Sequence, residues 1–394
     1  MTHQTAILSP RPRGLLLSLL AIVAGPLLLG LAACGGDGAT KLSRSDAAYA
    51  VEVLERAPEH GFATGSFNIA AVKQAREDRD PQAEAMLHAA LADYARAQHG
   101  LLIPAKSRPA AWGMKPAAYD AEPALDSAIA GKTFRAWLDE QPPTSGLYIA
   151  LQKAYVAARD GGRAAEAATL RANLERVRWL PRTDEATRVD VNIASATMTY
   201  FVDGRPQITM RTASGKPGDE TPILTSSIDH IVLNPPWNVP DGIANEELRP
   251  KGGAYLAANN FTTKEDGRLM QKPGPNSALG LVKFDFDNPY AVYLHDTPSK
   301  AAFGRDDRAV SHGCVRLERA MDLAGVLLAT RAGWTPEQLG EAMAKGETKT
   351  VKLDQPVPVR LLYLTAVPNG GAVTFLEDVY GWDAQVLERM DRRA

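Results

Sequence analysis

The chain has 394 residues, of which 45% are hydrophobic and 23% are charged. This composition is typical of a chain that buries a sizeable core, and the length allows two or three domains. The formal net charge of -2 leaves no electrostatic footprint for nucleic acid, so we expect no nucleic-acid partner.

Residues 1–33 have the pattern of an export signal. Arg11 and Arg13 precede an apolar run over 15–31, which is short for a bilayer span. The string L-A-A-C that ends at Cys34 resembles the lipobox of bacterial lipoproteins. This resemblance implies that Cys34 is lipidated and becomes the new N-terminus, so we expect a periplasmic protein anchored to a membrane, the outer membrane rather than the inner. The alternative is an uncleaved N-terminal anchor.

The sequence contains two cysteines, Cys34 and Cys314. If Cys34 carries lipid, Cys314 is a lone thiol in an oxidising compartment, where a free thiol is a hazard. A lone thiol retained there is a candidate reagent.

The next part of the chain is predicted to be a helical scaffold domain. Residues 34–44 are Gly-rich and polar and form a flexible tether. From 45 to 182 apolar residues recur at helical spacing, for example over 81–98, 147–155 and 170–177.

Near Arg188 the pattern changes to the alternation that is typical of strands. Strands are expected at 189–193, 198–202, 206–213, 228–234, 280–286, 290–295, 356–364 and 371–376. One helix should follow over 318–330, and another should start at Thr335 with a capping box that Gln338 completes. We therefore predict an α+β chain in which a mostly antiparallel, β-sandwich-like domain with flanking helices spans 183–394.

The stretch 238–278 fits neither period and is rich in Gly, Pro and Asn. It lies between two predicted strands and is long for a simple connection. We therefore expect a lid-like insertion over the functional site.

The string Ser311-His312-Gly313-Cys314-Val315-Arg316 carries the chemistry. A cysteine nucleophile needs a base and donors for the oxyanion, and Gly313 allows backbone N–H groups to approach a substrate closely. His295 ends an apolar strand 19 residues upstream of Cys314 and could face the same cleft as its base. The alternatives are buried packing, or a zinc site formed by His295, His312 and Cys314.

The motif S-H-G-C-V-R with an upstream Y-L-H-D-T-P resembles the L,D-transpeptidase family, whose catalytic domain is called YkuD. The similarity extends over roughly 170–335. It includes N-L-E-R-V-R-W-L-P-R at 173–182, T-P at 221–222 and N-P-P-W-N-V-P at 234–240, which mark the larger Gram-negative members with a scaffold domain.

This resemblance implies a role for each residue of the motif. Cys314 is the expected nucleophile and His295 its general base, with His312 as the alternative base. The carbonyl of Asp296 is expected to orient the imidazole. The remaining candidates shape the site, supply the oxyanion hole or bind substrate: Ser311, His312, the amides of Gly313 and Cys314, Arg316, Trp237 and Asn276. Trp237 could instead be a packing residue.

The resemblance further implies a peptidoglycan L,D-transpeptidase that needs no metal and no organic cofactor. The donor is a tetrapeptide stem, the acceptor is an amine, and the product is a 3→3 cross-link. Carbapenems are expected to acylate the enzyme. The alternatives are an L,D-carboxypeptidase or hydrolase, an enzyme that attaches a protein to peptidoglycan, and a non-catalytic wall-binding scaffold.

Overall fold

The computed structural model describes residues 41–274 and 276–392. The predicted signal peptide, the predicted lipidation site Cys34 and residues 34–40 of the predicted tether lie outside these ranges. Within them, no helix is both long and apolar enough to cross a membrane.

The first part of the described chain is helical, as predicted. The helices are α1 (Arg44–Glu55), α2 (Ile69–Glu77), α3 (Ala83–Gln98), α4 (Ala121–Ala130), α5 (Phe134–Asp139), α6 (Gly146–Asp160) and α7 (Ala164–Arg178). Short 3-10 helices lie between them: η1 (Ala57–His60), η2 (Ser66–Asn68) and η3 (Ala105–Ser107). Ser43 and Ser145 cap α1 and α6 by accepting hydrogen bonds from the backbone N–H groups of Asp46 and Tyr148.

Most of these helices pack into one of two large hydrophobic cores. Leu87, Leu91 and Tyr94 of α3 belong to a core shared with α1 and α5. The burial of each leucine stabilises the fold by about 1.5–3 kcal/mol. Helices α6 and α7 instead contribute Leu151 and Leu174 to the core beneath the strands.

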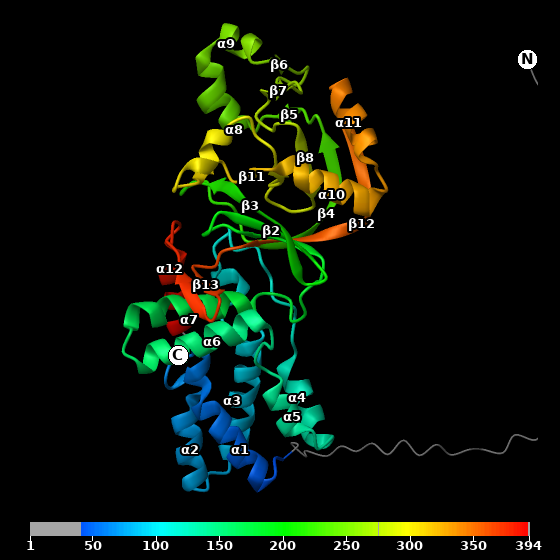
Figure 1. The fold of residues 1–394 in the computed structure, drawn as a ribbon. Coiled ribbons are helices and arrows are strands. Elements are labelled where there is room, and N and C mark those ends of the chain that lie inside the picture. Colours follow the sequence, from blue (N-terminus) through cyan, green and yellow to red (C-terminus); the bar gives the residue numbers. More distant parts are fainter. Residues whose placement is uncertain (1–40, 275, 393–394) are drawn as a thin grey trace, which may run out of the picture. The chain divides into compact units, whose positions relative to one another are not determined.

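Nine strands form one sheet (Figure 1). They are β1 (Arg188–Asn192), β2 (Thr197–Val202), β3 (Arg205–Gly215), β4 (Leu224–Leu233), β8 (Val282–Phe286), β9 (Leu294–His295), β10 (Ala309–Ser311), β11 (Val315–Leu317) and β12 (Lys349–Leu362). The order is β10-β3-β11-β9-β8-β4-β12-β1-β2, and β2 also pairs with β3, so the pairings close into a ring. The expected mostly antiparallel, β-rich domain is therefore built on a sheet whose pairings close on themselves, with parallel pairs at β1–β12, β9–β11 and β10–β3.

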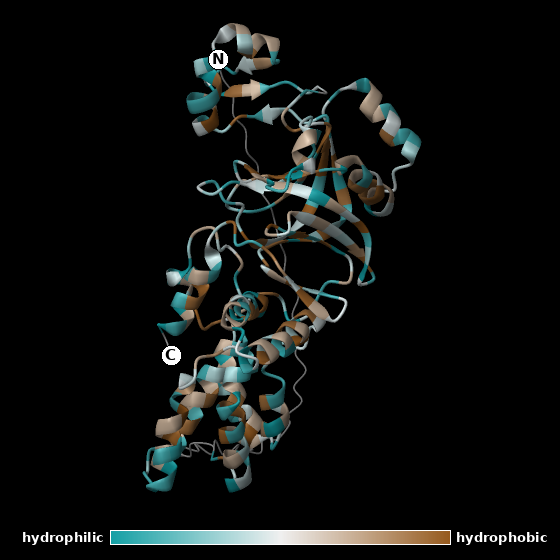
Figure 2. Cartoon of the chain, turned by 60° about the vertical axis from the view of Figure 1, so that its left-hand side comes forward, coloured by the Kyte–Doolittle hydropathy of each residue, from teal (hydrophilic) through white to brown (hydrophobic). Residues whose placement is uncertain are grey.

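Helices and a hairpin flank this sheet. They are α10 (Ala320–Ala332), α11 (Pro336–Lys345), the hairpin β13 (Ala366–Asn369) and β14 (Ala372–Phe375), and α12 (Trp382–Asp391). Helix α10 packs on β12 and buries Leu323 and Leu327. Helix α11 starts with the predicted capping box of Thr335 and Gln338. Figure 2 shows brown, hydrophobic residues on the strands of the sheet and on the helices beside it.

The insertion 238–278, which showed neither period, is folded. Its elements are β5 (Trp237–Asn238), α8 (Asp241–Ile243), the π-helix η4 (Ala244–Leu248), η5 (Arg249–Lys251), α9 (Gly253–Ala258), β6 (Phe261–Thr263) and β7 (Leu269–Gln271). The strands pair in the order β5-β7-β6. Val239, Leu248, Phe261 and Leu269 give this subdomain a small core of its own.

The strand predicted at 290–295 is mostly irregular, since only Leu294–His295 is paired as β9. The side-chain oxygen of Asn288 accepts the N–H groups of Tyr290 and Val292, and Ala291 has φ +53°. A side chain that binds these backbone groups replaces the strand ladder there. The segment after β9 forms the 3-10 helix η6 (Lys300–Gly304).

Candidate active site

The register of two short strands brings the candidate residues together. β9 and β11 are parallel neighbours in which Arg316 lies opposite His295 and Val315 opposite Leu294. Side chains alternate between the faces of a sheet, so the fully buried Leu294 and Val315 point into the core. Arg316 and His295 point to the other face.

The residues two positions before this pair share its face. Val315 N–H donates to the Tyr293 carbonyl at 3.1 Å and continues the ladder by one step, which places Cys314 beside Tyr293. Tyr293, His295, Cys314 and Arg316 all line one cavity of about 770 Å³. The Tyr293 and His295 rings meet edge to face, with centroids 5.6 Å apart.

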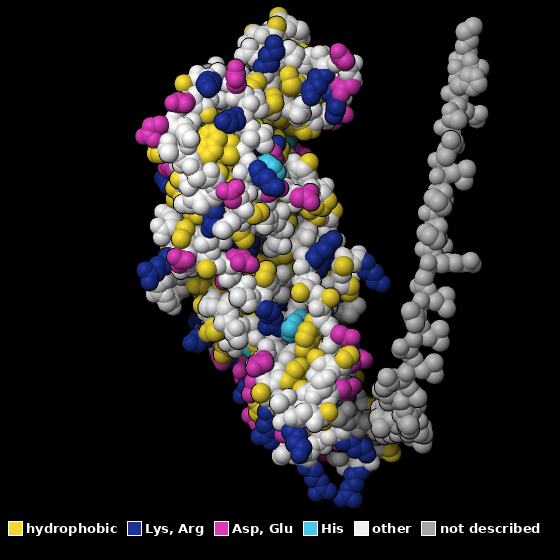
Figure 3. All heavy atoms as spheres, turned by 90° about the vertical axis from the view of Figure 1, so that its right-hand side faces the viewer, with side chains coloured by type: hydrophobic (Ala, Val, Ile, Leu, Met, Phe, Trp, Pro, Cys, Tyr) yellow, Lys and Arg dark blue, Asp and Glu magenta, His cyan; other side chains and the backbone are white. Residues whose placement is uncertain are grey.

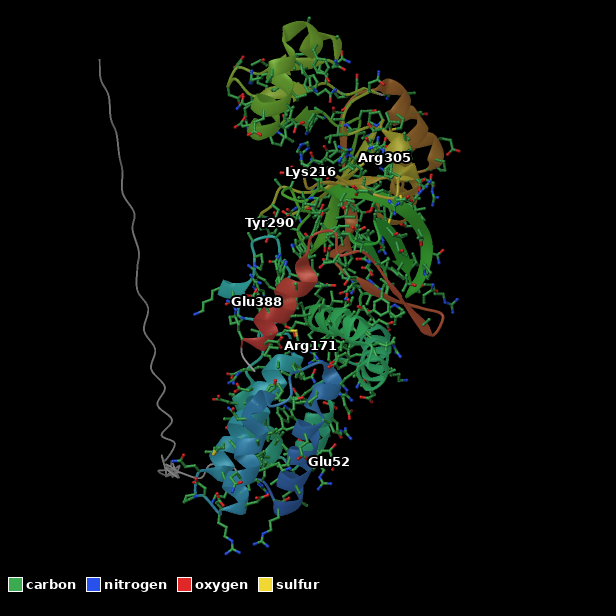
Figure 4. All side chains as sticks on the ribbon, turned by 90° about the vertical axis from the view of Figure 1, so that its left-hand side faces the viewer. Glu52, Arg171, Lys216, Tyr290, Arg305 and Glu388 are labelled. Atoms are coloured by element: carbon green, nitrogen blue, oxygen red, sulfur yellow. The ribbon has the colours of Figure 1, made fainter. Side chains whose placement is uncertain are left out.

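Ile243 and Glu247 of the insertion, together with Trp237 directly before it, form one wall of this cavity. Lys216 and Tyr290, labelled in Figure 4, line it from the sheet side. Trp237 also packs edge to face against Phe261, with the ring centroids 6.2 Å apart. Trp237 therefore both packs against the insertion and faces the cavity. Asn276 is exposed and is not among the lining residues.

The His295 ring is buried, with 4% of the residue exposed. Its Nδ1 lies 2.5 Å from the carbonyl oxygen of Asp296, so Nδ1–H donates and Nε2 keeps a free lone pair. Burial, followed by the charge of Arg316, lowers the His295 pKa to about 4. The imidazole is therefore neutral at neutral pH and able to accept a proton.

The Cys314 side chain is only partly exposed, and burial raises the pKa of its thiol. Hydrogen bonds from Tyr293 and the charges of Lys283 and Arg316 lower this pKa but do not cancel the effect of burial. Cys314 and His295 are therefore a neutral thiol and a neutral imidazole. Such a pair forms a thiolate only when the proton moves to histidine.

The backbone of the Cys314 loop is fixed by local hydrogen bonds. Gly313 has φ +104°, a conformation that favours glycine. Ser311 Oγ donates to the Cys314 carbonyl at 2.6 Å and accepts the Gly313 N–H at 3.2 Å. Among the described residues, the Cys314 N–H has no protein acceptor. Of the two predicted oxyanion donors, the Gly313 N–H is thus engaged and the Cys314 N–H is free.

His312 points to the insertion, where its Nε2 lies 2.6 Å from the Glu247 carboxylate. Arg316, in contrast, has no carboxylate partner in the described part of the chain although it is partly buried in the cavity.

The Asp296 carboxylate accepts the Leu281 N–H at 2.9 Å and Lys300 Nζ at 2.6 Å. Asp296 therefore braces the strand end through its side chain as well as its carbonyl.

The zinc alternative finds no support in the arrangement of these side chains. In residues 41–274 and 276–392, no group of three or more His, Cys, Asp and Glu side chains is placed to hold a metal ion.

Three residues at the site had no predicted role. Tyr293 stands two residues before His295 in a strand-like string, so its position was a usable signal. Thr221 lies in the T-P string but contacts Gly313 across the fold. Glu247 has no signal in the sequence, because only the fold of the insertion brings it to His312.

A cysteine and a histidine with a free Nε2 line the same cavity, and the backbone N–H of the cysteine has no protein acceptor in the described chain. These are the groups that a thiol nucleophile requires. Residues 186–352 match the model of the L,D-transpeptidase catalytic domain YkuD, and residues 39–154 match the scaffold domain. The chain therefore carries an L,D-transpeptidase catalytic domain of the YkuD family, preceded by a scaffold domain.

Individual relatives agree with this family. The chain is 34% identical over 237 residues to a Haemophilus influenzae protein named "Putative L,D-transpeptidase". The match covers 54% of this chain and 48% of that relative, so it spans about half of the relative's length.

Solved structures include the catalytic domain of an E. faecium L,D-transpeptidase acylated by ertapenem (16% identity, TM-score 0.25, 46% of this chain and 99% of that one). An L,D-transpeptidase from Mycobacterium smegmatis is 19% identical with a TM-score of 0.24, over 44% of this chain and 58% of that one.

Proposed function

We propose that this protein is a peptidoglycan L,D-transpeptidase that forms 3→3 cross-links through a thioester on Cys314. One observation carries the proposal: the β9–β11 register puts Cys314 and His295 on one face of a solvent-accessible cavity. The match of this region to the YkuD catalytic domain supports the same reading.

In the first half-reaction, Cys314 Sγ attacks the carbonyl of the third residue of a tetrapeptide stem while His295 Nε2 takes the thiol proton. The Cys314 N–H stabilises the oxyanion. The bond to the terminal D-Ala then breaks, His295 returns the proton to the leaving amine, and a thioester remains.

In the second half-reaction, the side-chain amine of another stem's third residue attacks the thioester carbonyl. His295 takes the amine proton, the C–S bond breaks, and the proton returns to sulfur. The unpaired guanidinium of Arg316 suits a carboxylate of the stem. The wall that the insertion supplies limits access of water, which would otherwise hydrolyse the thioester.

The setting of this activity is also a proposal. Lipid on Cys34 would hold the enzyme on a periplasmic membrane surface, with the outer membrane favoured. Lys, Arg, Asp and Glu are interspersed on the face in Figure 3, so this face offers no basic patch for membrane attachment.

The test is to incubate the purified protein with tetrapeptide muropeptides and to identify products by mass spectrometry. Cross-linked dimers that have lost one D-Ala are expected from wild type, and no product from Cys314→Ala. Tripeptides alone would indicate a carboxypeptidase. If neither product forms, a tetrapeptide stem and a lysine-containing protein acceptor are tested together. No product in that assay either would leave the wall-binding scaffold as the remaining reading.

A further inference from the structure

The C-terminal segment beyond the matched catalytic domain contacts the 215–221 loop, which in turn contacts the Cys314 loop. Tyr380 is 8% exposed, and its hydroxyl donates to the Gly215 carbonyl at 2.6 Å. The same hydroxyl accepts the Thr221 N–H at 3.2 Å. Tyr380 therefore joins the two ends of the 215–221 loop, which follows β3.

Thr221 connects the 215–221 loop to the Cys314 loop. Its side chain is fully buried, and its hydroxyl donates to the Gly313 carbonyl at 2.7 Å and accepts the Gly215 N–H at 2.8 Å. The loop is tight, since a Cβ at Gly215 would collide with the Asp219 carbonyl oxygen. Thr221 thus has little freedom to follow a displaced Gly313.

The geometry of the peptide group explains why this contact matters for chemistry. A trans peptide is planar, and its C=O and N–H point in opposite directions. A hydrogen bond that fixes the Gly313 carbonyl therefore also fixes the direction of the Cys314 N–H. In the described part of the chain, that N–H has no protein acceptor.

Buried hydrogen bonds and ring stacking fix the position of Tyr380 itself. Its N–H donates to the Tyr363 hydroxyl at 2.9 Å, and the two rings stack with centroids 5.2 Å apart. Tyr363 donates to Asp378, which also accepts the N–H groups of Trp382 and Asp383 at the start of α12. Glu388, labelled in Figure 4, marks this helix.

We propose that Tyr380 and Thr221 are positioning residues that hold the Gly313–Cys314 peptide with the Cys314 N–H directed into the cavity as an oxyanion donor. The inference rests on the proposed acyl-transfer function. It makes the segment after β12 part of the catalytic apparatus, although the family match ends at residue 352.

The experiment compares two reactions of the same thiol in the full-length protein. A carbapenem needs the oxyanion donor, because Sγ adds to the lactam carbonyl, the ring C–N bond breaks, and nitrogen takes the proton. The adduct carries the full mass of the carbapenem. Iodoacetamide needs only the nucleophile, because sulfur displaces iodide. Intact-mass time courses give both rates.

Tyr380→Phe is expected to slow carbapenem acylation about tenfold, and Thr221→Val about 100-fold, since loss of one oxyanion donor typically costs about 10²–10³. Thr221→Ser keeps the hydroxyl and should stay within about threefold of wild type. Iodoacetamide alkylation should change less than about twofold in every variant.

Tyr148→Phe is the matched control. It removes a buried hydroxyl that, like that of Tyr380, both donates and accepts hydrogen bonds: its partners are Gln98, Arg178 and His60 Nδ1, and it lies in α6 away from the cavity. Its acylation rate should equal that of wild type, whatever its effect on thermal stability.

Equal acylation rates in Tyr380→Phe and Tyr148→Phe would overturn the inference. So would a parallel fall of acylation and alkylation, because that pattern indicates a damaged thiol and not a misdirected amide. If wild type is alkylated but not acylated, the proposed function itself fails, and the inference fails with it.

Discussion

Lowering the pH tests the protonation state of His295 directly. Burial and the charge of Arg316 lower the pKa of this histidine to about 4. A histidine with that pKa is only about 10% protonated near pH 5, so carbapenem acylation should lose about a tenth of its rate from this source. A histidine with an ordinary pKa would be about 97% protonated there, and the rate would fall about 30-fold.

The assay is the single-turnover rate of Cys314 acylation, followed by intact mass from about pH 7.5 down to about pH 5. The sign follows from the charge: a depressed histidine pKa keeps the imidazole neutral, and therefore basic, at lower pH. Arg316→Gln removes the neighbouring cation, which should raise the His295 pKa and move the acid limb to higher pH.

An acid limb near the ordinary histidine value in wild type would refute the reasoning. So would a thiolate absorbance at neutral pH, because the raised pKa of Cys314 predicts a neutral thiol.

Four further outcomes are expected. His295→Ala should slow acylation about 10²–10⁴-fold, whereas His230→Ala, which alters a partly exposed ion pair on β4, should not; a crippling His312→Ala alone would instead favour the alternative base. Glu175→Ala should lower the free energy of unfolding by about 3–5 kcal/mol in a urea titration, because it leaves the fully buried Arg178 unpaired; a loss below about 1 kcal/mol would contradict this. Shortening the insertion 238–278 should shift products from dimers to tripeptides while acylation of Cys314 survives; an unchanged product ratio would exclude a lid. Cys34→Ala should release the protein from membranes with activity intact, and a Cys34–Cys314 disulfide in the mature protein would contradict both expectations.

The sequence alone predicted two kinds of feature: elements whose hydrophobic spacing repeats over many residues, and functional residues that lie close together in one motif. The helix over Ala83–Gln98 and the capping box at Thr335 follow from side-chain spacing alone. His295 and Cys314 could be paired because one ends an apolar strand and the other lies in a glycine-containing motif. They line one cavity because two residues of β9 pair with two residues of β11. The sequence predicts a strand that ends at His295, but it does not predict the partner or the register of that strand.

The remainder depends on contacts between distant residues. The strands of the insertion, such as Phe261–Thr263 and Leu269–Gln271, are too short for alternation to be recognised. Tyr380 lies 159 positions from Thr221, and a single tyrosine near a helix carries no pattern that indicates such a contact. The ring closure likewise arises from β2 pairing with β3 at one edge while β12 joins β1 to β4.

The position of β12 has a consequence for chain integrity. This strand, Lys349–Leu362, pairs in parallel with β1 and antiparallel with β4, so the ring of strand pairings is closed at this point only while β12 is in place. Proteolysis before Lys349 followed by loss of the C-terminal fragment would leave β1 and β4 with unpaired edges, each a template for adding a strand from another molecule. A clipped enzyme should therefore be lost from solution by self-association and not persist as a weakened monomer.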